Sequence, residues 1–193
     1  MKTKLLLITC VLILFVSAVN AQKPDTAVPV SWQQYKVGGE VFSVALPVLP
    51  AMHLNQKWLE GDRKPRHEVL LGSYADGVVY SVYVLENSSL RWSLQDFIGA
   101  QISSGFGWKV DNGRDVNREG VAGKSYLLVP DDGMVQFFAS EDRLYEFRVL
   151  GASPDDPRAT KFFSSVSFGK VKDAVEAKEG SGLPFDSGVQ EER

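Results

Sequence analysis

Cysteine is nearly absent from this sequence of 193 residues, and its one occurrence, Cys10, lies in a segment that we expect to be removed. Residues 1–21 have the parts of a secretory signal in order: a positively charged start, an apolar run over residues 5–16 and small residues before Gln22. Cleavage after Ala18 would also fit this pattern. The mature chain would then have no disulfide, no thiol nucleophile and no cysteine metal ligand.

A long hydrophobic run is also missing. The apolar part of the signal is shorter than the roughly 20 residues of a membrane-spanning helix, which favours cleavage over anchoring. We therefore expect an exported protein, periplasmic or extracellular, with no membrane span after signal cleavage.

The sequence has no excess of positive charge. It contains 21 lysine and arginine residues against 24 aspartate and glutamate residues, for a net charge of −3. Residues 1–21 hold two of those basic residues and none of the acidic ones, so the mature chain would carry −5. A nucleic-acid-binding protein needs a basic stripe, and this class is excluded.

Histidine is scarce, and no catalytic motif is complete. His67 opens a stretch similar to the zinc protease motif, but Leu71 occupies the position of the second histidine. The segment 120–125 resembles a phosphate-binding loop, but Arg118 stands where the first glycine is required, so a turn is predicted. The sequence therefore predicts no catalytic residue, no metal and no cofactor. A serine–histidine–aspartate group assembled in space stays open, since sequence order does not exclude it.

Alternation of apolar and polar residues predicts an antiparallel sheet. The alternation begins at residues 41–46, continues in a hairpin over 69–74 and 78–85, and ends with three strands over 124–129, 134–139 and 143–150. Asp76-Gly77 suits the tight turn of the hairpin. Residues 78–85 are apolar on both faces, which is typical of a strand inside a sheet covered on both sides. In the strand at 143–150, Glu146 and Arg148 predict one wetter face.

Two segments have the pattern of amphipathic helices. Ser93 and Asp96 form a capping box before an apolar stripe of Leu94, Phe97, Ile98 and Ile102. Ser153 is the predicted N-cap of a second helix, whose stripe comprises Ala159, Phe162, Phe163 and Val166. Between the helices, residues 108–116 read as extended, with a bulge or a tight turn at 112–113. Residues 166–168 are a candidate short final strand.

These elements predict four parts of the chain. Residues 1–21 are the signal peptide, 22–31 a linker, 32–170 one α+β domain, and 171–193 an acidic tail without enough apolar residues to offset its ordering entropy. About 150 residues bury enough apolar surface to fold without disulfides.

The domain resembles exported bacterial proteins that share the fold of PsbP, the extrinsic photosystem subunit. The resemblance is carried by Phe-Ser-Val-Ala-Leu-Pro at 42–47, Gly-Val-Ala-Gly-Lys at 120–124, Arg-Leu-Tyr at 143–145 and the closing pattern of 159–168. It implies an α/β/α sandwich: an antiparallel sheet of about six or seven strands flanked by helices. Members with known roles mostly bind protein partners, and the resemblance carries over no functional residue.

A basic loop is the candidate contact surface for such a partner. Residues 52–66 are predicted to form a loop in which Lys57, Trp58, Arg63, Lys64 and Arg66 gather in an otherwise acidic protein. We expect a non-enzymatic binding or accessory module with an unidentified protein partner.

Two alternatives stay open. One is a hydrolase or small-ligand-binding protein with a pocket beside the sheet, lined by Trp32, Trp92 or Trp108 and using His53 or His67. The other is a self-associating structural component of the cell envelope.

Overall fold

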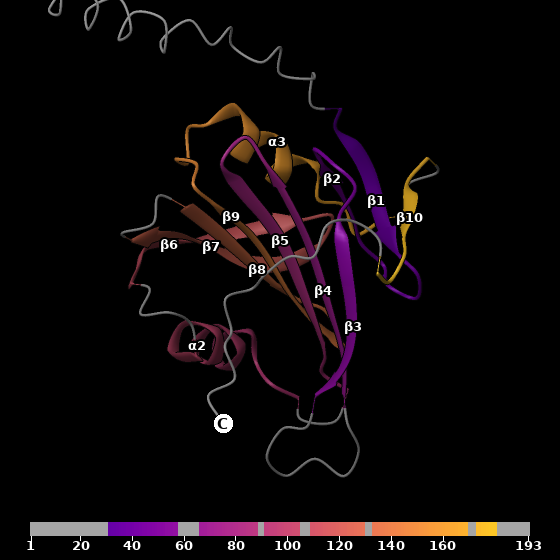
Figure 1. Ribbon diagram of the computed structural model, residues 1–193. Coiled ribbons are helices and arrows are strands. Elements are labelled where there is room, and N and C mark those ends of the chain that lie inside the picture. The colour runs from indigo at the N-terminus through magenta and orange to yellow at the C-terminus, as the bar shows by residue number, and fades with distance from the viewer. Residues whose placement is uncertain are drawn as a thin grey trace, which may run out of the picture. The chain divides into compact units, whose positions relative to one another are not determined.

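The computed structural model describes residues 31–57, 66–88, 91–104, 109–129, 133–169 and 173–180 (Figure 1). Its helices are α2 (Leu94–Ser104) and α3 (Pro157–Ser165). Its strands are β1 (Gln33–Val37), β2 (Ser43–Leu46), β3 (Ala51–Lys57), β4 (Arg66–Ala75), β5 (Val78–Glu86), β6 (Lys109–Arg118), β7 (Val121–Val129), β8 (Gly133–Ala139), β9 (Arg143–Leu150) and β10 (Val175–Ala177).

The strands form two sheets, which confirms a sheet-rich α+β fold. Seven strands form an antiparallel sheet in the order β3-β4-β5-β9-β8-β7-β6. The sequence predicts β2 in this same layer, and that prediction is wrong: β2 pairs with β1 in a separate sheet of order β10-β1-β2. The predicted strand at 166–168 is reduced to one bridge, between Ser43 and Ser167. In the described part of the chain, α2 and α3 are too short and too polar to cross a bilayer.

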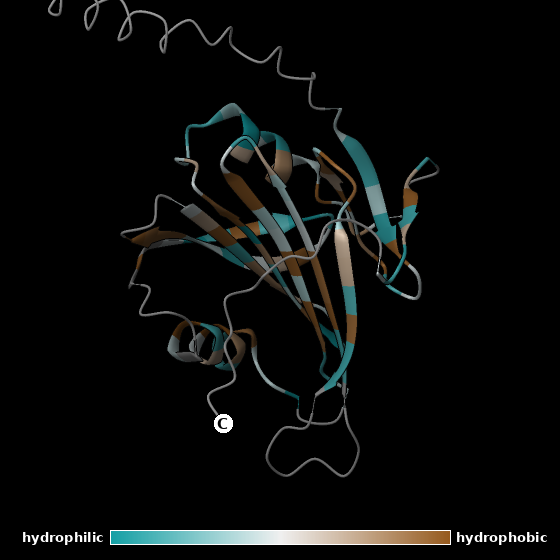
Figure 2. Cartoon of the chain, viewed as in Figure 1, coloured by the Kyte–Doolittle hydropathy of each residue, from teal (hydrophilic) through white to brown (hydrophobic). Residues whose placement is uncertain are grey.

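Strand β5 is buried on both faces, as its sequence predicts. Val82 and Val84 belong to one hydrophobic core, and Leu85 belongs to another. Because side chains of a strand alternate between its faces, the two cores lie on opposite sides of the large sheet. Figure 2 shows how hydrophobic residues dominate this strand.

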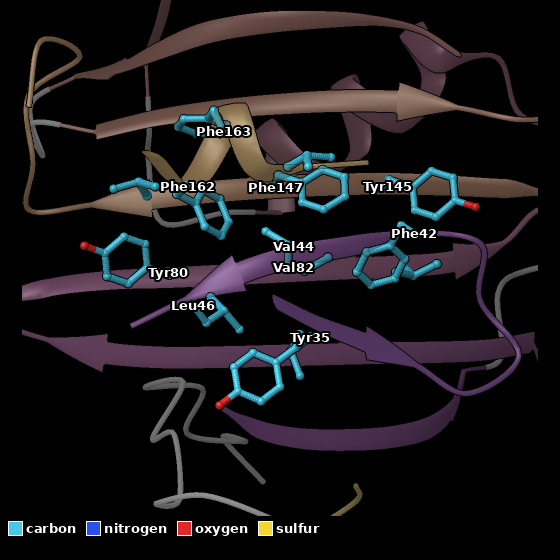
Figure 3. Close-up of a cluster of buried hydrophobic side chains, with 14 of the residues drawn as sticks. Tyr35, Phe42, Val44, Leu46, Tyr80, Val82, Tyr145, Phe147, Phe162 and Phe163 are labelled. Atoms are coloured by element: carbon cyan, nitrogen blue, oxygen red, sulfur yellow. The ribbon is translucent and has the colours of Figure 1, made fainter. Parts of the chain in front are cut away.

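The first core lies between the large sheet, the small sheet and α3. Phe42, just before β2, packs edge-on against Phe147 of β9 with ring centroids 5.6 Å apart. Phe162 of α3 lies 5.5 Å from Tyr80 of β5. Figure 3 shows these rings converging from the two sheets and the helix. The face is thus covered by strands as well as a helix, and each fully buried ring stabilises the fold by about 1.5–3 kcal/mol.

The second core lies under α2. Phe97 packs edge-on against Phe137 of β8 with centroids 5.8 Å apart, and Ile98 is buried beside it. The helix begins with the predicted capping box: the Asp96 amide donates to the Ser93 hydroxyl at 3.1 Å, and the Ser93 amide donates to the Asp96 carboxylate at 2.9 Å. The reciprocal bonds satisfy two amides at the helix start.

The predicted hairpin turn is confirmed, and one of the two alternatives for residues 112–113 is confirmed as well. Asp76 and Gly77 have φ of 51° and 78° between the paired residues Ala75 and Val78, as a two-residue hairpin turn requires. In β6 the register of pairing shifts between Asp111 and Arg114, so the structure contains the predicted bulge and not the tight turn.

Residues 52–57 differ from prediction because they form strand β3. Pairing continues from Ala51 opposite Gly72 to Lys57 opposite Arg66. Their polar composition predicts a loop, but residues 53–56 are exposed at the edge of the sheet, where a strand does not need apolar alternation. Residues 58–65 of the predicted loop lie outside the described residues, and Arg66 begins strand β4.

Strand β10 lies inside the segment predicted to be a disordered tail. Val175 pairs with Tyr35 in a parallel arrangement, and Ala177 is buried in the first core. The Gly180 amide then donates to the Met52 carbonyl at 3.1 Å. Strand β10 has only three residues, and its partner β1 lies at the other end of the domain. Neither strand has a local pattern that identifies it, so the sequence analysis predicted neither.

Helix α3 begins three residues later than predicted. Asp156, and not Ser153, is the N-cap: its carboxylate accepts from the Arg158 amide at 2.7 Å, and Pro157 takes the first helical position. The segment contains two similar Ser/Asp-Pro starts, and the second one governs. The predicted apolar stripe is confirmed, since Ala159, Phe162, Phe163 and Val166 are all buried.

Glu146 is buried, whereas the sequence predicts that it lies on a wet face. Its exposed fraction is 3%, and its carboxylate lies 3.5 Å from the Arg148 guanidinium, which also donates to the Ser81 hydroxyl at 3.1 Å. Burial raises the pKa of Glu146, and the positive charge of Arg148 partly opposes this effect.

We expect the burial of Glu146 to make stability depend on pH. Between the ordinary pKa of 4.5 and the raised one, the folded state binds more protons than the unfolded state, so stability rises as pH falls through this window. In urea titrations at several pH values, the wild type should gain free energy of unfolding relative to Glu146→Gln on acidification. Glu141→Gln, in an exposed turn, is the control and should run parallel to the wild type. If the pH dependence of Glu146→Gln runs parallel to that of the wild type, Glu146 is not the source of the effect.

Candidate functional site

Three connections meet at one end of the large sheet, which we call the loop end (Figure 1). They are the segment that leaves β5 at Asn87 and enters α2 after Ser93, the turn 140–142 between β8 and β9, and the connection that follows the last β3–β4 pair, Lys57 with Arg66; residues 58–65 and 89–90 of these connections lie outside the described residues. The main-chain amide of Asn87 donates to the main-chain carbonyl of Asp142 at 2.8 Å, and this bond joins the first two connections.

Asn87 fixes the conformation of the segment that follows β5. Its side-chain amide donates to the Trp92 carbonyl at 2.9 Å, and its side-chain oxygen accepts from the Trp92 amide at 2.9 Å. The residue is 5% exposed, so these bonds are made away from water. Arg91 has a φ of 53°, a left-handed conformation that is uncommon for a residue with a long side chain.

An open depression lies between the clamped segment and the turn. Arg91 is exposed beside it, while Trp92 is half-buried and packs against the second core. The lining combines one arginine, one tryptophan, two acids and small polar groups: Asn87, Ser88, Arg91, Trp92, Ser140, Glu141 and Asp142.

Ion pairs hold the turn against the rest of the domain. The Arg143 guanidinium donates to Glu40 at 3.2 Å and to Asp142 at 3.1 Å. Burial raises the pKa of the Glu40 carboxyl, and Arg143 opposes this effect. Although burial disfavours its charged form, the pKa of Arg143 is raised by the negative charge of Glu40.

The predicted contact loop starts at this same end of the sheet. Lys57 and Arg66 lie opposite each other as the last pair of the β3–β4 ladder. Trp58, Arg63 and Lys64 lie outside the described residues. The hairpin base is tied to β5, because the His67 amide donates to the Glu86 carboxylate at 3.2 Å.

Both His67 and Ser88 bond to the Glu86 carboxylate, so a histidine, a serine and a carboxylate, the residue types of a hydrolytic triad, lie together here. The Ser88 hydroxyl donates to Glu86 at 2.8 Å, whereas His67 reaches Glu86 through its main chain. Between the described residues, the hydrogen bonds of this group do not involve the imidazole, so it lacks the serine–imidazole link of a triad. His53 lies four strand positions before Lys57, opposite Leu70, and is exposed.

Two of the tryptophans proposed as alternative pocket linings, Trp32 and Trp92, pack against different cores. Trp32 packs edge-on against Tyr80 at 5.4 Å, and the Lys161 ammonium lies 4.9 Å from its ring centroid. Trp92 belongs to the core on the opposite face of the sheet. Trp108 lies outside the described residues.

Metal-ligating side chains do not gather in groups of three or more anywhere in the described part of the chain. No protein-family model, curated protein or solved structure matches the sequence.

The sequence analysis missed Asn87 and the turn 140–142 as parts of a site. The available signal was an asparagine directly after a strand, since its side chain readily bonds nearby main-chain groups. Its partner Trp92 is five residues away, so the specific bonds required the structure.

We expect Asn87→Ala to cost about 1–3 kcal/mol in free energy of unfolding, because it leaves the amide and carbonyl of Trp92 without their buried partner. Urea denaturation followed by Trp fluorescence measures this loss. Ser88→Ala, which removes only an exposed hydroxyl bond, should cost less than about 0.5 kcal/mol. Equal costs for the two variants would show that the clamp is unimportant.

Proposed function

We propose that the protein is an exported, non-enzymatic binding module that recognises a protein partner through the loop end of its large sheet. The observation that supports this most directly is the Asn87 clamp, which holds Arg91 and Trp92 beside the acidic turn 140–142. Arginine and tryptophan are enriched among the residues that dominate protein interfaces.

The loop end presents charges of both signs. Glu141 and Asp142 lie on the exposed turn, and the basic residues of the hairpin connection follow from Lys57. A surface with adjacent patches of opposite sign favours a partner with the complementary pattern and speeds association at low salt. It suits a folded protein better than a polyanion, which the acidic turn would repel.

We also infer the finer fold and the location from the sequence. The PsbP-like relation is supported by the two helices that contribute to cores on opposite faces of the sheet. Export is supported by the pattern of residues 1–21.

Charge reversal tests the contact surface. A photo-activated crosslinker placed at Ser88 in the native host should capture one defined partner. Arg63, Lys64 and Arg66 changed together to Glu should lower that capture at least tenfold, because three attractive charges become repulsive.

The control is a matched reversal of Lys36, Arg114 and Lys178, which are exposed elsewhere and change the net charge equally. This variant should capture the partner as well as the wild type. Equal capture by both reversed variants would mean that the hairpin loop is not part of the contact.

A further inference from the structure

The large sheet has two edges that differ in their protection. Strand β6, at one edge, contains the bulge between Asp111 and Arg114 and carries the exposed charges of Arg114 and Asp115. Bulges and charges are the usual devices that keep an edge from pairing with another chain. Edge β6 is therefore protected.

Strand β3, at the other edge, has no bulge, and its one lysine or arginine, Lys57, is its last residue. Its seven residues pair with β4 in unbroken register, and proline and acidic residues are absent from residues 51–57. Residues 53–56 are all exposed, and the exposed fraction of Leu54 is 44%. Figure 2 shows that the strand is hydrophobic at its start and mostly hydrophilic further along.

In the small sheet, the outer edge of β2 is covered by residues at the end of α3 and just after it. Ser43 of β2 exchanges main-chain bonds of 2.8 and 3.0 Å with Ser167, and the Ala45 amide donates to the Ser165 hydroxyl at 2.8 Å. Among the described edges longer than three residues, β3 is the one that remains open.

One main-chain bond already forms on the open edge. The Gly180 amide donates to the Met52 carbonyl at 3.1 Å, so the main-chain groups of Met52 point away from β4. Outward groups recur at every second residue of an antiparallel edge. Those of Leu54 and Gln56 therefore also face outward, beyond the reach of the Gly180 bond.

We propose that β3 is a dimerisation edge, at which a second copy of this chain adds its own β3 in antiparallel orientation. A two-fold axis at Asn55 pairs Leu54 with Gln56 of the second copy, Gln56 with its Leu54, and Asn55 with its Asn55. Each outward residue then exchanges two main-chain bonds, and the Gly180 bond to Met52 is kept. These three pairs are uncharged, and the pairing is the same in both copies, as a two-fold interface requires; Lys57 lies outside them, opposite His53 of the second copy.

Because Asn55 lies on the proposed two-fold axis, changing it gives a direct test. The test uses the full chain, expressed with its own N-terminal segment in an exporting host. Sedimentation velocity of the wild type should show a concentration-dependent monomer–dimer equilibrium. Asn55→Lys and Asn55→Asp each place like charges opposite each other, and each alone should raise the dimer dissociation constant about tenfold or more. A mixture of the two variants should recover the dimer as a heterodimer.

Thr160→Lys, an exposed change on α3, is the matched control and should dimerise like the wild type. Gln56→Pro removes an outward amide while leaving the β3–β4 ladder intact, and it should also yield monomers. Circular dichroism establishes that each variant is folded. A wild type that stays monomeric at all concentrations overturns the proposal. So does a dimer that neither charged variant weakens, or a mixture that fails to restore it.

Discussion

The two-sided burial of β5 is the constraint on which the rest of the structure depends. Its alternating side chains belong to two different cores, so each face of the large sheet needs its own cover. Residues of α2 contribute to one core, and residues of α3 and the small sheet contribute to the other. At the strand ends, polar side chains from several connections lie outside the two cores and close to one another. This is why the candidate site consists of connections and not of strand interiors.

The parts of the fold that could be predicted from sequence are those specified by neighbouring residues. Asp76-Gly77 identifies its hairpin turn, and Ser93 with Asp96 identifies the start of α2, because each signal acts over a few residues. Strands β1 and β10 could not be found in this way. Their pairing joins residues at opposite ends of the domain, and neither has a periodic pattern long enough to be recognised.

The candidate site was predictable only in part. The basic residues from Lys57 to Arg66 are visible as a cluster in the sequence, and the structure shows that their flanking strands end beside Glu86. The clamp made by Asn87 joins residues that no motif connects. Glu146 shows the opposite failure: a charged residue in an alternating strand indicates an exposed face, yet here an ion pair with Arg148 allows it to be buried.

The parallel pairing of β1 with β10 has a consequence for the order in which the chain becomes stable. During synthesis β1 and β2 emerge first, but the strand that completes their sheet arrives about 140 residues later, along with the buried Ala177. Long-range pairing of this kind is slow to form because its loop must close first. An incomplete chain therefore lacks part of the packing of the small sheet until its last strand appears.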